Sequence, residues 1–285
     1  MDRDQGIGPR GRLAAFLHRH AGVRLSLLLS APMAWLGVAY LGALAALFLT
    51  SFWSTDTFTG DLVRTFTWAN FQDLATGEVY RTIALRSLGV AVAVTLIDLV
   101  VAFPMAFAMA KLASPRAQRW LVILVLTPLW ASYLVKAYAW RVLLSSGGLL
   151  GWGFGVGATV LTLSYLWLPY MILPLYAGLE RLPNSLLEAA GDLGARGWRT
   201  FRTVVLPLAF PSIVAGSIFT FSLSLGDYIA VKIVGGSSQL LGNVVYDNIG
   251  AANNLPFAAA VATVPALIML VYLAAVRRTG ALENL

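Results

Sequence analysis

Six apolar stretches, each long enough to cross a membrane as a helix, dominate this sequence. Crossing the hydrocarbon core takes about 20 apolar residues at roughly 1.5 Å of rise each. Because lipid offers no partner to backbone N–H and C=O groups, such stretches fold as helices. The sequence therefore predicts an all-α, polytopic membrane protein with six transmembrane helices. The predicted spans are residues 26–53, 85–111, 119–144, 156–179, 208–231 and 256–276.

The composition also identifies lipid as the main solvent. Hydrophobic residues make up 59% of the chain and charged residues 12%, whereas soluble domains carry about 25% charged residues. The chain has no cysteine, which excludes a disulfide framework, a thiolate metal site and a thiol nucleophile. The net charge is +7, but the arginines flank apolar segments instead of forming one water-facing cluster, so nucleic-acid binding is not indicated.

The distribution of positive charge predicts the side of the membrane that each loop faces. Most of the 20 Lys and Arg residues precede the first span, follow the last one, or lie in the loops after the second and fourth spans. Because positively charged loops stay in the cytoplasm, both termini are expected there. The first apolar run exceeds the roughly 7–15 residues of a signal-peptide core, so we expect it to remain as a helix. The expected organisation is a cytoplasmic segment over residues 1–25, a transmembrane domain over 26–279 and a cytoplasmic tail over 280–285.

The loop between the fourth and fifth spans, residues 180–207, has a readable local pattern. Ser185 and Glu188 match a capping box, in which the serine covers a free N–H group and the glutamate reaches back to the start of the helix. After this first short helix, Gly194 permits a turn. A second short helix is expected to follow and to stop at Pro207. The apolar side of the first helix is expected to contain Leu186, Ala189, Ala190 and Leu193.

Two interpretations of this loop follow from its residues. Small side chains at Ala189, Ala190 and Gly194 leave room for another protein surface to approach closely. Alternatively, the loop rests on the membrane with its arginines facing anionic lipid. Charge alone leaves both interpretations open. The arginines concerned are Arg196, Arg199 and Arg202.

The spacing of the loop distinguishes the two interpretations. The order is Glu188-Ala189-Ala190, three residues, Gly194, nine residues, Val204, one residue and Leu206-Pro207. This order resembles the EAA signature of ABC importer permeases, with Val204 in the place of isoleucine. The resemblance implies a type I ABC importer permease fold, in which this loop docks on a cytoplasmic ATPase subunit. The residues to which it assigns ATPase coupling are Ser185, Glu188, Ala189, Ala190, Gly194, Leu206 and Pro207.

Further motifs are similar to those of the first permease in spermidine/putrescine-type importers. They are TWANF at 67–71, TPLW at 127–130, YAWR at 138–141, LPYMILPLY at 168–176 and GDY at 226–228. Related importers for iron, thiosulfate or aminoethylphosphonate share parts of these motifs. The glycine-rich stretch 145–157 is shorter than in that family and lacks its usual Asn, which leaves the geometry of this loop open.

The resemblance implies a transport subunit that hydrolyses nothing itself. No G-x-x-x-x-G-K-[ST] motif occurs, so ATP and Mg²⁺ are expected in a partner ATPase present in two copies. A second homologous permease, an extracytoplasmic binding protein and the bacterial cytoplasmic (inner) membrane complete the implied setting. No cofactor or metal is expected in this chain, because His18 and His20 lack partners at ligand spacing.

Other classes of function fit the sequence less well. A stand-alone secondary transporter would be expected to carry an inverted repeat or paired broken helices, and neither is detectable in the sequence. An intramembrane enzyme is not indicated, because no HExxH or GxSxG motif occurs. The sequence therefore predicts a permease, with a polyamine as the favoured solute.

Carboxylates and aromatic faces are the groups that would guide a flexible polycation. From the helical rise per residue, we expect Trp130, Tyr133 and Asp227 to lie roughly 17, 21 and 28 Å from the inner face. The alternatives are packing roles for the aromatic residues and, for Asp227, a salt bridge to Lys232 or Lys136. The candidate path residues are Asp227, Tyr228, Trp130, Tyr133 and Asp98.

Asp98 is a special case because an acid within a span is a functional hypothesis by default. It could line a cavity on the inner side of the membrane. It could equally be a buried acid that bonds to Thr95 or to a neighbouring helix. The second role is favoured.

Overall fold

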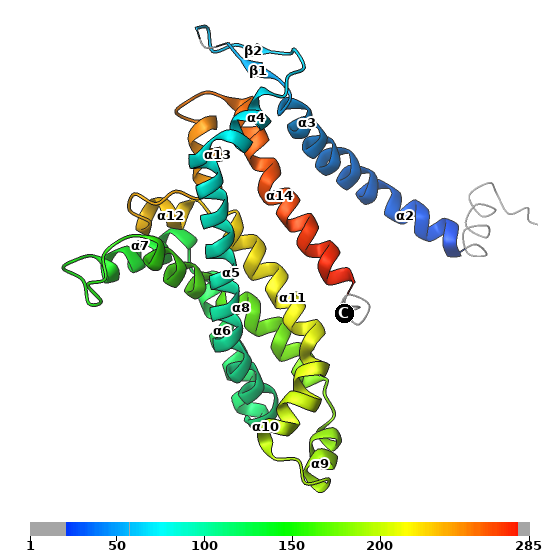
Figure 1. Ribbon diagram of the computed structural model, residues 1–285. Helices are drawn as coiled ribbons and strands as arrows, with labels where there is room; N and C mark the ends of the chain where they lie inside the picture. Colours follow the sequence, from blue (N-terminus) through cyan, green and yellow to red (C-terminus); the bar gives the residue numbers. More distant parts are fainter. Residues whose placement is uncertain (1–20, 57, 279–285) are drawn as a thin grey trace, which may run out of the picture.

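The computed structural model describes residues 21–56 and 58–278, so residues 1–20 and the predicted tail 280–285 lie outside the described part (Figure 1). Helices dominate, and two short strands form the one hairpin among these residues. The first half contains α2 (Ala21–Trp35), the π-helical turn η1 (Leu36–Leu41), α3 (Gly42–Thr50), β1 (Ser54–Thr55), β2 (Leu62–Val63), α4 (Ala69–Thr76), α5 (Glu78–Phe107), η2 (Ala108–Leu112), α6 (Pro115–Trp130) and α7 (Tyr133–Leu144). The second half contains α8 (Val156–Glu180), α9 (Asn184–Asp192), α10 (Gly197–Thr200), η3 (Phe201–Val205), α11 (Leu206–Leu225), α12 (Ile229–Val234), α13 (Leu241–Ile249) and α14 (Leu255–Arg277).

The prediction of an all-α membrane protein is confirmed. Five continuous helices among the described residues are long and apolar enough to cross a membrane, and a sixth crossing is formed if the bent pair α6 and α7 counts as one. The third predicted span overlaps the bent pair, and each of the other five overlaps one of the continuous helices. The five helices are Leu28–Thr50, Glu78–Leu112, Val156–Glu180, Gly197–Leu225 and Leu255–Arg277.

The third predicted span, 119–144, is wrong as a single straight helix. α6 ends at Trp130, α7 begins at Tyr133, and the two are bent by 90°. Ala131 has extended backbone angles, φ −75° and ψ 142°. Pro128 lies in the last turn of α6, where it removes a backbone donor and weakens the helix just before the bend. The depths estimated for a straight helix therefore do not apply to Trp130 and Tyr133.

The fifth predicted span, 208–231, differs from the structure at both ends. Its helix starts at Gly197 and runs without interruption to Leu225. Pro207 therefore does not end the second loop helix, contrary to the expectation. The π-helical turn η3 ends at Val205, two residues before Pro207, and such a turn loosens the helical hydrogen-bond pattern near a proline, which lacks an N–H. At the other end, the helix stops before Asp227 and resumes as the short α12.

The core of the bundle lies between α5, α8 and α11 (Figure 1). Small and large side chains alternate there, so that the helices approach closely. Gly216 of α11 faces Met171 of α8, and a Cβ atom at Gly216 would lie 3.2 Å from the Met171 Cα atom. Buried members of the largest cluster include Ala102, Ala106, Met171, Leu175, Leu179 and Ala209.

One end of the bundle carries the hairpin, α4 and α13. β1 pairs antiparallel with β2, with Ser54 opposite Val63. Asp56 accepts the backbone N–H groups of Thr59 and Phe58, and these hydrogen bonds hold the pKa of its carboxyl group below the usual value. Buried Ser87 of α5 accepts the N–H of Leu241 at 2.9 Å, which ties the start of α13 to the bundle.

The N-terminal helices lie apart from this core. α3 contacts α14, while α2 extends away from the bundle (Figure 1). None of the residues in the span Leu28–Thr50 is buried within the chain. This long apolar surface therefore faces lipid or another protein.

The close approach of α8 and α11 predicts that Gly216→Leu destabilises the fold. Overpacking a tight core typically costs about 1–3 kcal/mol. We expect a lower midpoint of thermal unfolding in detergent. Gly89→Leu is the matched control, because Gly89 is exposed on α5 and a Cβ atom there meets nothing within 4 Å. Equal midpoints for the two variants would contradict the prediction.

Candidate functional site

α9 and α10 form a projection at the end of the bundle opposite the hairpin (Figure 1). The predicted turn at Gly194 is confirmed, with φ +75°. The N–H of Gly194 donates to the Gly191 carbonyl at 2.8 Å, and the N–H of Ala195 donates to the Ala190 carbonyl at 2.9 Å. These two bonds form a Schellman motif, in which glycine supplies the left-handed residue at the end of the helix. The projection therefore has a defined shape of its own.

The predicted capping box is wrong. α9 begins at Asn184, directly after Pro183, and its N-cap makes no side-chain cap bond. Ser185 therefore lies one residue inside the helix, too late to cap it, and Glu188 is displaced with it. Lys111 at the end of η2 anchors this start instead. Its Nζ atom donates to the Leu182 carbonyl at 2.5 Å and to Asn184 Oδ1 at 3.1 Å.

Of the four residues predicted to form the apolar side of α9, one is buried and three are exposed. Ala190 is buried, and neighbouring Leu187 packs on the core cluster. The other three predicted residues, Leu186, Ala189 and Leu193, are exposed, with Leu193 at 89%. A Cβ atom at Gly194 would meet nothing within 4 Å, so this side of the projection is open. The tip thus presents two leucines, Leu186 and Leu193, beside small residues.

The last two residues of the signature lie in the span and not in a loop. Leu206 and Pro207 form the first turn of α11, which continues α10 and η3. The projection is therefore joined to the span by an unbroken helix.

A second candidate site lies at the opposite end of α11, where the helix is interrupted. The Tyr133 hydroxyl donates to Asp227 Oδ2, and the N–H of Ala230 donates to Asp227 Oδ1 at 2.9 Å. The carboxylate thus covers the first turn of α12, where backbone donors lack helical partners. Only 8% of Asp227 is exposed. The structure joins Tyr133 and Asp227, two of the predicted path residues, across 94 positions of sequence.

The predicted salt-bridge alternative for Asp227 is wrong. Lys232 pairs with Asp247, with 2.8 Å between Nζ and Oδ1. Lys136 donates to the Pro128 carbonyl at 3.0 Å, and this carbonyl also accepts the N–H of Ala131 at 3.3 Å, so Lys136 adds a second donor at the bend after α6. Asp227 is therefore held by neutral donors.

The other predicted path residues lie elsewhere. Trp130 is 91% exposed at the end of α6. Tyr228 stacks on Tyr246 of α13, with ring centroids 4.8 Å apart. Asp98 is fully buried beside Ser164 of α8, and its oxygen atoms make no hydrogen bond of good geometry to the described residues. Thr95 bonds to the Ala91 carbonyl, so the expected Thr95 partner is wrong.

Sequence reasoning missed a row of aromatic rings that begins at the acidic break. Tyr133 lies 5.8 Å from Trp167, Trp167 lies 5.8 Å from Tyr170, and Tyr170 lies 6.4 Å from Phe219 of α11. The spacing of Trp167 and Tyr170 on one side of α8 was the available signal. Aromatic residues are common in membrane helices, so that spacing alone carries little weight.

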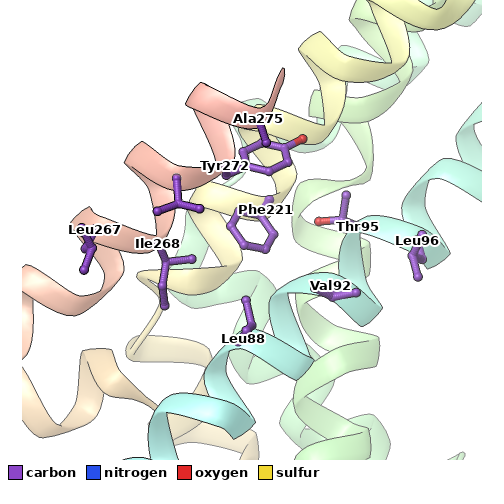
Figure 2. A pocket seen from close by; sticks show the side chains of 10 residues that line it. Leu88, Val92, Thr95, Leu96, Phe221, Leu267, Ile268, Tyr272 and Ala275 are labelled. Atoms are coloured by element: carbon purple, nitrogen blue, oxygen red, sulfur yellow. The ribbon is translucent and has the colours of Figure 1, made fainter. Parts of the chain in front are cut away.

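An apolar pocket of about 630 Å³ opens between α5, α11 and α14 (Figure 2). Its hydroxyl groups already have partners within the chain. Thr95 donates to the Ala91 carbonyl, and Tyr272 shares a hydrogen bond with Ser217. The pocket fits hydrocarbon and not a charged solute.

Comparisons with known proteins agree with this geometry. The family described as "Binding-protein-dependent transport system inner membrane component" matches residues 102–278. The inner membrane ABC transporter permease protein YdcU of Escherichia coli (strain K12) is 44% identical over 96% of both chains. The spermidine/putrescine transport system permease protein PotB of Haemophilus influenzae is 35% identical over 68% of this chain and 74% of its own.

The fold also matches a solved structure. It is a bacterial alginate ABC transporter in complex with an alginate pentasaccharide-bound periplasmic protein. The matched chain has a TM-score of 0.66 and 15% identity, with 92% of this chain and 94% of that chain covered. Such low identity supports the fold alone.

The two Lys111 hydrogen bonds predict that Lys111→Met loosens α9. Hydrogen bonds to charged groups contribute about 1.5–3 kcal/mol, so amide hydrogen exchange in residues 184–195 should become roughly tenfold faster or more. Arg116→Met is the control, because Arg116 is exposed near the same end. Unchanged exchange in Lys111→Met would contradict the anchoring role.

Proposed function

Because the chain belongs to the family of binding-protein-dependent transport system inner membrane components, we propose that this ABC importer permease forms half of the path for a small cationic solute. The favoured solute is a polyamine, spermidine or putrescine. The PotB relatives, named as spermidine/putrescine permeases, support this choice. The acidic and aromatic residues around the interruption between α11 and α12 also support it, because carboxylates and ring faces attract ammonium groups.

The observation that carries the proposal is the rigid projection joined to a span by unbroken helix. We place this projection, and both termini, in the cytoplasm. The exposed residues Leu186, Ala189 and Leu193, with Gly194 beside them, form the surface that meets the ATPase. Glu188 lies on the same exposed turn, while Ala190 and Ser185 belong to the helix that supports it. Leu206 and Pro207 carry motion from the projection into α11.

The remaining partners follow from this arrangement. ATP and Mg²⁺ belong to two copies of a cytoplasmic ATPase, and a second permease completes the path. An extracytoplasmic binding protein delivers the solute, as the alginate transporter's complex with a periplasmic protein illustrates for that system. The chain itself is not an enzyme.

The solute path is proposed to pass the Tyr133–Asp227 pair. In the described conformation Tyr133 covers the carboxylate, so the pair has to part before an ammonium group meets Asp227. The row from Trp167 to Phe219 offers ring faces further along. Trp130, which is exposed at the end of α6, and Asp98, which is buried, are proposed for other parts of the path.

Gly194→Val should uncouple transport. A branched side chain disfavours the left-handed conformation at this position and adds bulk to the open surface. We expect loss of ATPase co-purification and at least a tenfold fall in ATP-driven uptake, with normal insertion into the membrane. Gly194→Asn is the control, because asparagine tolerates this conformation. Undiminished ATPase yield together with normal uptake in Gly194→Val would refute the docking role.

Asp227→Asn should weaken transport of a polycation more than assembly. Interactions with a charged partner contribute about 1.5–3 kcal/mol, so KM for spermidine should rise roughly ten- to hundredfold. Labelled spermidine uptake into proteoliposomes measures this change. Asp61→Asn is the control, because Asp61 is an exposed acid directly before β2. Unchanged uptake at limiting spermidine would remove Asp227 from the path, and failure of the unmodified importer to take up polyamines would favour an iron, thiosulfate or aminoethylphosphonate importer.

A further inference from the structure

We propose that Tyr228, Tyr246 and Asp247 form an ammonium-binding site that the chain's own Lys232 occupies until a solute ammonium group displaces it. The site is separate from the Asp227 carboxylate, although Tyr228 follows Asp227 directly in sequence. Naming the displacing group as one end of a polyamine rests on the proposed function. The site itself rests on the geometry that follows.

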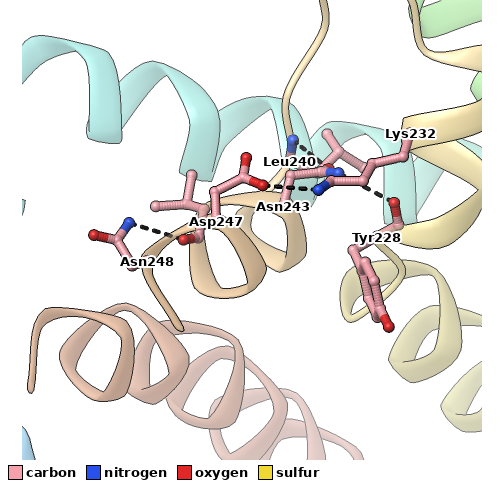
Figure 3. A network of polar contacts seen from close by, with 7 residues as sticks. Tyr228, Lys232, Leu240, Asn243, Asp247 and Asn248 are labelled. Atoms are coloured by element: carbon pink, nitrogen blue, oxygen red, sulfur yellow. Dashed lines mark hydrogen bonds and ion pairs between the residues drawn. The ribbon is translucent and has the colours of Figure 1, made fainter. Parts of the chain in front are cut away.

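The bound ammonium group is that of Lys232. Its Nζ atom lies 2.8 Å from Asp247 Oδ1, and Figure 3 shows this ion pair. The same Nζ atom lies 3.8 Å from the centroid of the Tyr246 ring. Tyr228 stacks on Tyr246 with the ring planes 22° apart. One carboxylate and a ring face therefore contact one cation, and a second ring supports the first. This is the donor set with which proteins recognise alkylammonium groups.

The surrounding elements hold the site in place without Lys232. Asn243 Nδ2 donates to the Tyr228 carbonyl at 3.1 Å, and Asn243 Oδ1 accepts the N–H of Leu240 at 3.2 Å. Asn243 is itself almost fully buried. Tyr246 and Asp247 are consecutive residues on α13. Removing the lysine side chain would thus leave the two rings and the carboxylate supported.

Lys232 is positioned to be replaced. The side chains of Lys232 and Asp247 are 40% and 39% exposed, so solvent and solute reach both. Ion pairs with this much exposure are weak. Lys232 lies on the short α12, and its ammonium group is carried by a flexible four-carbon side chain. Its terminal group is a primary alkylammonium, chemically the same as the ends of putrescine.

Occupation of the site by Lys232 lowers the measured affinity for a solute ammonium group by a definite factor. When a site is free for only a fraction of the time, the apparent dissociation constant rises by the inverse of that fraction. If Lys232 fills the site about nine-tenths of the time, its removal should tighten binding by roughly tenfold. The tethered lysine also neutralises Asp247 while no solute is present.

The test measures equilibrium binding of labelled putrescine to the assembled importer in lipid nanodiscs without nucleotide. Lys232→Met keeps most of the side-chain bulk and removes the charge, and it should bind putrescine about tenfold more tightly than the unmodified protein. Lys232→Arg retains an internal cation and should behave as the unmodified protein does. The double variant Lys232→Met with Asp247→Asn should lose the gain.

Arg64→Met is the matched control, because Arg64 also lies over an aromatic ring, that of Trp53, at 5.5 Å, but outside the site. It should leave putrescine binding unchanged. The proposal is overturned if Lys232→Met binds as the unmodified protein does, if Arg64→Met gives the same gain, or if the gain survives loss of the Asp247 carboxylate. Thermal unfolding midpoints identify any variant that fails to fold, and Lys232→Gln, which also removes the charge, then replaces Lys232→Met in the comparison with Arg64→Met.

Failure of this site and failure of the proposed function give different results. Spermidine uptake by the unmodified importer, with no gain in Lys232→Met, overturns only the site. Absence of polyamine uptake, with tighter putrescine binding in Lys232→Met, overturns the polyamine assignment and supports an ammonium site.

Discussion

Inside a bilayer, every backbone group that leaves a helix has to find its partner within the protein. This constraint bears on both interrupted spans. At the bend after α6, the Pro128 carbonyl accepts both the N–H of Ala131 and the ammonium group of Lys136. The start of α12 exposes N–H groups, and Asp227 accepts that of Ala230 while Tyr133 holds its other oxygen. Since Tyr133 and Lys136 both belong to α7, one short helix stabilises the two interruptions together.

This mutual support explains why polar chemistry gathers at one end of the bundle. A continuous helix buries its own backbone and needs no side-chain help. An interruption recruits carboxylate, hydroxyl and ammonium groups, and these are also the groups that can bind a charged solute. Asp227 thus has a structural task, and any role in the path has to be compatible with it. Tyr228 shows the same combination, because its carbonyl is held by Asn243 while its ring stacks on Tyr246.

The sequence predicted much of the fold because hydrophobic length is a strong and local signal. Six apolar runs identified the crossings, and a glycine at the end of a short amphipathic helix located the turn at Gly194. The signature in the loop pointed to the correct family.

The errors share a physical origin, which is that neighbours distant in sequence decide local geometry. Pro128 is compatible with a kink or a break, and only the partners on α7 and at Asp227 make a 90° bend stable. A proline such as Pro207 commonly marks the end of a helix, yet the π-helical turn before it lets the helix continue. Ser185 matched a cap by spacing, but Pro183 moved the helix start. The pairing of Tyr133 with Asp227 spans 94 positions and has no signal in either segment.

The uninterrupted helix from Gly197 to Leu225 has a mechanical consequence. Its 29 residues amount to a rod of roughly 44 Å, longer than the hydrocarbon core. A continuous helix transmits tilt along its length, whereas a flexible connection would absorb it. Pivoting such a rod by about 5° moves its far end by roughly 4 Å. A displacement of that size exceeds the length of a hydrogen bond, so a small swing at one membrane face is enough to separate a tyrosine from a carboxylate at the other.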